Sequence, residues 1–197
     1  MSHGDWQLGN SFFSQISLFG LLLWLPLSSA SQEIIPADPR IVEAAFLRNF
    51  AHYVDWPDHA FADERSPWYV CVLGNDPFGE VLERTFEGRT ELGRTFKILR
   101  SDNPSELNQC QIVYVAYKVS ASRRAALAKL RGKPVLTVGN ARDFLHEGGV
   151  IRFDVEEYVK INVNLDQARA VELAIQTKML EVSNDIIENG KLRGVKR

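Results

Sequence analysis

The sequence has few of the residues from which metal and nucleophile sites are built. It contains two cysteines and four histidines in 197 residues. No two histidines stand at the HExxH spacing of zinc hydrolases, and no cysteine or second histidine lies near enough in sequence to complete a zinc site. The GxSxG nucleophile motif, the P-loop and the GxGxxG fingerprint are absent as well. We therefore predict a binding protein with no catalytic residues, no metal and no cofactor.

The sequence also lacks an excess of either charge. It has 23 basic and 25 acidic residues and no stripe rich in Lys or Arg. A nucleic-acid-binding protein usually carries such a stripe, so nucleic acid is excluded as a partner. Apolar residues make up 45% of the chain, which is ordinary for a globular protein with a core. The length suits one domain, which we place over residues 31–197.

The longest apolar run is too short to cross a membrane. Residues 12–27 carry no charge, and the densest apolar part covers residues 18–27. A spanning helix needs about 20 apolar residues, whereas the apolar core of a secretory signal peptide has about 7–15. Small residues follow at 28–30, so we predict an exported protein with a signal peptide over residues 1–30. The first eleven residues lack the usual Lys or Arg, and a buried N-terminal helix is the alternative.

Both cysteines lie in β-branched stretches. Cys71 stands in YVCVL, and Cys110 begins CQIVYV. Two neighbouring strands bring Cα atoms within the ~4.4–6.8 Å that a disulfide requires, and export takes the chain to a compartment where disulfides form. We predict a Cys71–Cys110 disulfide. Two free thiols in the core are the alternative, because Cys is among the most buried residue types.

Apolar spacing and capping residues divide the rest of the chain into helices and strands. Asp38 is a good N-cap, Pro39 suits the first helical position, and Trp56-Pro57 ends this first helix. Further helices are predicted at residues 77–86, 120–130, 140–146 and 164–186, and strands at residues 68–73, 95–99, 112–116, 134–138, 150–155 and 158–163.

The last of these helices carries the strongest pattern. Asn164 followed by Gln167 is a capping-box signature, and apolar residues between positions 165 and 186 share one helical face. The basic tail from Gly190 is predicted to be a solvated terminus.

The order of the elements predicts the fold class. Strands alternate with helices, and the last two strands are separated by Glu156-Glu157, which favours a hairpin. We predict a three-layer α/β fold with a mainly parallel sheet, an antiparallel C-terminal hairpin and helices on both faces.

One turn has the outline of a ligand site. The strand at 68–73 runs into GNDPFG at residues 74–79, where a helix begins. Ligands of open α/β sheets bind outside the carboxyl ends of strands, and free N–H groups at a helix start attract anions. A plain turn with a helix cap is the alternative. The candidate ligand-binding residues are Asn75, Asp76, Phe78 and Gly79.

Four stretches of the chain, in order, resemble the YfiR-like family of periplasmic proteins. They are EAAFLRNF with YVDWP within residues 43–57, CVLGNDPFG at 71–79, PVLTV with the later GGVI within 134–151, and NVNLDQA with KML within 162–180. The resemblance implies a periplasmic repressor that restrains an inner-membrane diguanylate cyclase, and so controls cyclic di-GMP and biofilm formation. It also implies a homodimer and a small-molecule ligand. A periplasmic small-molecule-binding sensor without a cyclase partner is the alternative function.

The resemblance also bears on the cysteines. Cys71 and Cys110 look like one cysteine pair of the family. Some members carry a second pair, and the comparable positions here are near Leu145 and Arg152. A redox switch built on that second pair therefore cannot operate in this chain.

Overall fold

The computed structural model of this protein describes residues 38–195. The predicted signal peptide at 1–30 and the residues that follow it to 37 lie outside the described residues. The helices are α1 (Pro39–Tyr53), α2 (Val81–Phe86), α3 (Ser120–Leu130), α4 (Leu165–Ala170) and α5 (Thr177–Glu181), with short 3₁₀ helices η1 (Asp58–Ala60) and η2 (Pro104–Leu107). None of these helices has the length and apolar character needed to cross a membrane.

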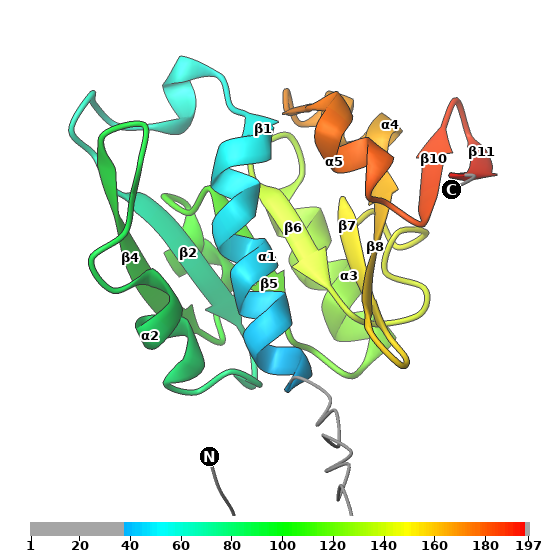
Figure 1. Ribbon diagram of the computed structural model, residues 1–197, viewed down its shortest axis with the longest axis horizontal. Coiled ribbons are helices and arrows are strands. Elements are labelled where there is room, and N and C mark those ends of the chain that lie inside the picture. Colours follow the sequence, from blue (N-terminus) through cyan, green and yellow to red (C-terminus); the bar gives the residue numbers. More distant parts are fainter. Residues whose placement is uncertain (1–37, 196–197) are drawn as a thin grey trace, which may run out of the picture. The chain divides into compact units, whose positions relative to one another are not determined.

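A mixed sheet of nine strands forms the centre of the fold (Figure 1), in the order β11-β10-β8-β7-β6-β5-β2-β4-β3, while β1 and β9 form a separate pair. The strands are β1 (Val54–Asp55), β2 (Trp68–Leu73), β3 (Thr90–Glu91), β4 (Arg94–Ser101), β5 (Ile112–Val115), β6 (Leu136–Gly139), β7 (Ile151–Val155), β8 (Val159–Asn164), β9 (Ala174–Ile175), β10 (Asp185–Glu188) and β11 (Lys191–Gly194).

Two apolar layers cover the two faces of this sheet. Val70 and Val72 of β2 join a cluster that includes α1, α2, α4 and α5, whereas Cys71 and Leu73 join a second cluster with α3. Successive strand residues point to opposite faces, which explains this division. Figure 1 shows α1 in front of the sheet and α3 behind it. The predicted three-layer fold, with a mainly parallel sheet and helices on both faces, is confirmed.

The predictions that depended on local signals are confirmed at α1 and at the hairpin. Asp38 caps α1 by accepting a hydrogen bond from the N–H of Arg40 at 3.0 Å. Strands β7 and β8 pair antiparallel, with Val155 opposite Val159 at the turn. The chain therefore folds at both places as its capping and turn residues indicate.

The predicted single helix over residues 164–186 is wrong. Its start is correct, since the side-chain oxygen of Asn164 accepts from the N–H of Gln167 at 2.9 Å. However, α4 ends at Ala170, Glu172 adopts a φ of 59°, and the N–H of Leu173 bonds to the Ala168 carbonyl. This is the way helices commonly end. The helix stops there because residues 174–175 pair with β1 and residues 185–188 enter the sheet beside β8.

Residues 191–194 of the basic tail are exposed to solvent, as predicted, but they also form β11, antiparallel to β10. The connection is Asn189-Gly190, with φ values of 53° and 68°. Asn-Gly with two positive φ values is the preferred two-residue connection of a hairpin. The sequence therefore carries a local signal for this second hairpin, and it lies directly after the apolar pattern that favours a continuous helix.

The predicted short helix at residues 140–146 is replaced by a series of turns over 142–148. Phe144 is fully buried, and a Cβ at Gly149 would overlap its ring. The N–H of Gly149 bonds back to the Phe144 carbonyl, and Gly148 has a φ of +101°. Gly149 is thus required by the closely packed Phe144 ring, and Gly148 by its left-handed φ.

Candidate functional site

The predicted ligand turn follows β2, and its polar groups bond mainly to the protein itself. The Asp76 carboxylate accepts from the N–H of Phe78 at 2.8 Å and from Nε of Arg100 at 2.7 Å. Arg100 also donates to the Gly79 carbonyl at 2.9 Å, and its pKa is raised by its hydrogen bond to Glu83. The structure therefore brings Asp76 and Gly79 together around one arginine.

The other two predicted residues of this turn point elsewhere. Phe78 is 1% exposed, and the centroid of its ring lies 4.8 Å from that of Tyr114, so Phe78 belongs to the core. Asn75 is exposed. The neighbouring Gly74 has its φ at +96° and lies against the Tyr117 ring, which leaves no room for a side chain there. Ligand binding at residues 75–79 stays a prediction.

A carboxylic acid is buried near Tyr114, whose ring packs against Phe78. Glu43 of α1 is 4% exposed, and burial raises its pKa to about 7. Proximity to the Tyr114 hydroxyl partly opposes this rise, although that hydroxyl makes no hydrogen bond of good geometry within residues 38–195. Burial likewise raises the pKa of Tyr114. The sequence carries no sign of this site, because the burial of one polar helical position cannot be read from an amphipathic pattern.

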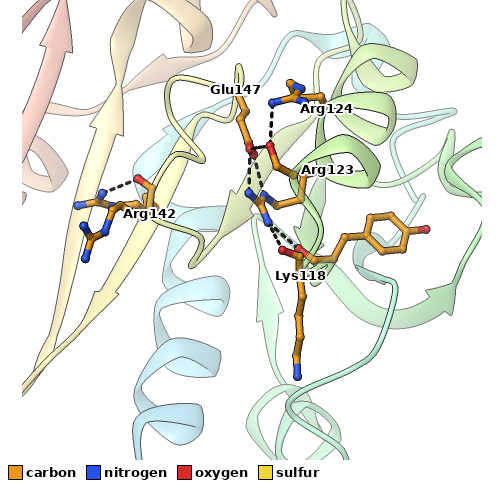
Figure 2. Close-up of polar contacts among 8 residues, drawn as sticks. Lys118, Arg123, Arg124, Arg142 and Glu147 are labelled. Carbon is orange, nitrogen blue, oxygen red and sulfur yellow. Dashed lines mark hydrogen bonds and ion pairs between the residues drawn. The ribbon is translucent and has the colours of Figure 1, made fainter.

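A second polar cluster anchors the loop that follows β6. Arg123 of α3 and Glu147 of the loop point toward each other (Figure 2), with Nε 2.7 Å from Oε2. Both side chains are buried, and the Arg123 hydrogen bonds lower the pKa of Glu147. Arg152 of β7 donates to the Arg142 carbonyl at 2.8 Å, which ties the other side of the loop. This arrangement holds the loop in place, and its two buried charges neutralise each other.

An apolar groove lies between α1 and α5, with Ile161 of β8 also lining it, and has a volume of about 430 Å³. Its polar lining residues are Asn49, Lys178 and Glu181. Interfaces between proteins combine an apolar centre with a polar rim in this way. We call it the α1–α5 groove. Its apolar lining residues are Phe46, Phe50, Tyr53, Ile161, Met179 and Val182.

The predicted disulfide is present between Cys71 and Cys110, whose Cα atoms are 6.1 Å apart. It connects β2 to the residues that precede β5, on the face covered by α3. Both cysteines are buried at 2% exposure or less, so the bridge lies within the core.

Comparison with known proteins identifies the family. None of the curated proteins matches the chain. Among solved structures, the chain is similar to an ABC domain in complex with L-Trp from Streptococcus pneumonia, with a TM-score of 0.48 and 9% identity over 73% of this chain and 60% of that one. This chain thus spans less than two thirds of that protein. The sequence model described as DUF4154, YfiR/HmsC-like, matches residues 41–184. The chain therefore belongs to the YfiR/HmsC-like family.

Proposed function

We propose that this protein is a negative regulator of an inner-membrane diguanylate cyclase, which it restrains from the periplasm and through which it controls cyclic di-GMP signalling and biofilm formation. The observation that carries this proposal is its membership of the YfiR/HmsC-like family. YfiR-like proteins are periplasmic regulators of such cyclases. The work of the protein is then the binding of a partner by its surface.

The α1–α5 groove is the surface that we assign to this partner. Its apolar lining and polar rim suit an amphipathic segment from the periplasmic region of the cyclase. Val182 lies at the edge of the groove with 52% of its surface exposed, so a bound segment would cover it. The charges of Lys178 and Glu181 would orient that segment.

The function is tested by deleting the gene and measuring cyclic di-GMP. We expect the level to rise and to return to normal when the wild-type gene is supplied. An unchanged level in the deletion strain would refute the regulatory role. Cell fractionation tests export separately: the expected product is periplasmic and cut after Ala30, and an uncut cytoplasmic product would contradict the localisation.

The groove is tested with a matched pair of variants. Val182→Glu places a charge at the edge of the groove, whereas Ala128→Glu places one on the exposed side of α3, on the opposite face of the sheet. We expect V182E to accumulate normally without lowering cyclic di-GMP, and A128E to act as wild type. Full activity of V182E would move the partner surface away from the groove and leave the regulatory role intact.

A further inference from the structure

A second cavity, of about 710 Å³, lies at the amino end of β2, at the opposite end of that strand from residues 75–79. It is formed by the segment that follows α1, by the start of β2 and by the turn between β3 and β4. Its volume lies within the range of about 300–1,000 Å³ that is typical of sites for small molecules. Neither the family match nor the α1–α5 groove accounts for it.

Three aromatic side chains line this cavity as walls at steep angles to one another. The Trp56 and Trp68 ring centroids are 5.0 Å apart with planes at 75°, and the Phe61 and Trp68 centroids are 4.8 Å apart at 90°. Trp68 is 2% exposed, and its indole N–H donates to the Glu91 carbonyl at 3.0 Å, which fixes its orientation. The resulting arrangement is an aromatic box, defined here as Trp56, Phe61 and Trp68.

Carboxylates surround the aromatic box. The acidic residues that line the cavity are Asp55, Asp58, Asp63 and Glu64, against Arg94 and His59. Asp55 accepts a hydrogen bond from Gln176, and Asp63 is bonded within its own turn. The side chains of Asp58 and Glu64 make no ion pair within the described part of the chain. Asp58 and Glu64 therefore give the cavity two negative charges that no basic side chain of the described residues neutralises.

A cationic side chain of the protein, that of Arg94, already lies against one ring of the aromatic box. The Arg94 guanidinium lies 4.1 Å from the centroid of the Phe61 ring and donates to the carbonyls of Asp63 and Ser66 at 2.8 and 2.7 Å. A cation over an aromatic face is attracted by the ring quadrupole, and tryptophan attracts it most strongly. The Trp56 indole lines the same cavity.

We propose that this cavity binds a small organic cation, a quaternary ammonium compound. The ammonium group contacts the Trp56 ring, because Trp68 is buried and Arg94 covers Phe61, and it is neutralised by Asp58 and Glu64. This site is independent of cyclase regulation and of the α1–α5 groove, so either proposal can fail without the other.

Choline is the probe, because it is a small and soluble quaternary ammonium compound. Titration calorimetry on the purified protein is expected to show saturable choline binding. The neutral isostere 3,3-dimethylbutan-1-ol is expected to bind about tenfold more weakly, since it keeps the shape and loses the cation–π attraction and the charge pairing. Tryptophan fluorescence is expected to change with the same titration curve, because Trp56 and Trp68 both line the cavity. Absence of saturable choline binding, or equal binding of the isostere, overturns the proposal.

Variants assign the contacts. The double variant Asp58→Asn with Glu64→Gln is expected to weaken choline about tenfold, whereas Glu157→Gln, at the exposed tip of the β7–β8 hairpin, leaves binding unchanged. Trp56→Phe keeps an aromatic wall and replaces the ring type that attracts cations most strongly, so we expect it to weaken choline and tetramethylammonium alike. Wild-type affinity in the double variant overturns the role of the carboxylates, and unchanged binding of both ligands in W56F overturns the role of the Trp56 ring.

Discussion

Replacing Glu43 with glutamine is expected to stabilise the protein above neutral pH and to have a much smaller effect in acid. Burial raises the pKa of this carboxyl from an ordinary 4.5 to about 7 in the folded protein. The folded state therefore holds the Glu43 proton more tightly than the unfolded chain does. The resulting contribution to stability is complete below about pH 4.5, declines as the pH rises through about 7, and is lost above it.

The difference between the two pKa values sets the magnitude. At about 1.4 kcal/mol for each pH unit, a rise from 4.5 to about 7 corresponds to roughly 3 kcal/mol. Glu43 is 4% exposed, so solvent screens this effect little. Glutamine has nearly the same shape and cannot ionise. We therefore expect the free energy of unfolding of E43Q, relative to wild type, to increase by roughly 3 kcal/mol between pH 4.5 and pH 8.5.

Urea unfolding of both proteins across this pH range measures the difference directly. Other carboxyls, such as Glu147, have lowered pKa values, so their contribution to the free energy of unfolding is lost in acid. This loss is the same in both proteins and cancels in the difference between them. Glu157→Gln serves as the control, because Glu157 is exposed and its replacement is expected to give a flat difference. A difference for E43Q that stays within about 0.5 kcal/mol from acid to alkali would refute the assignment of Glu43 as a buried acid that ionises near neutrality.

Three further substitutions test the packing. Cys110→Ser removes a disulfide between residues 39 apart in sequence and is expected to cost roughly 3–4 kcal/mol, measured by urea unfolding, and reductant is expected to shift the wild type to the same midpoint. Glu147→Gln leaves the Arg123 guanidinium buried without its counter-charge, and a loss of about 3–5 kcal/mol in the same assay is expected; a loss below 1 kcal/mol would mean that the pair is solvated. Gly149→Ala places a Cβ against the Phe144 ring and is expected to lower the melting temperature by several degrees, whereas an unchanged melting temperature would show that the loop adjusts freely.

Much of the fold could be predicted because its signals are local. Asp38 and Asn164 cap helices with their own side chains, within three residues of the groups that they bond. The β-branched residues around Cys71 and Cys110 indicated strands and so allowed the disulfide to be predicted from sequence. The Asn189-Gly190 turn is an equally local signal, and it predicts the β10–β11 hairpin.

The candidate sites depended on contacts between distant parts of the chain. The predicted turn at 75–79 had the right residues for a ligand, but Arg100 on another strand bonds Asp76, and the core takes Phe78. The α1–α5 groove joins residues more than one hundred positions apart. The aromatic box joins Trp56 and Phe61 to Trp68 only because the segment after α1 folds back over the start of β2.

The sequence by itself determined which segments are helical or extended wherever a cap, a proline or an alternating pattern acts on its own neighbours, and it indicated the family. Only the tertiary structure decided where the chain after Ala170 leaves the helix, because residues 174–175 satisfy the backbone groups of β1, some 120 positions earlier. Only the tertiary structure, too, decided that Glu43 is buried and that the aromatic residues form a box. Short-range hydrogen bonds are encoded by adjacent residues, whereas burial and cavities arise from surfaces that meet after the chain has folded.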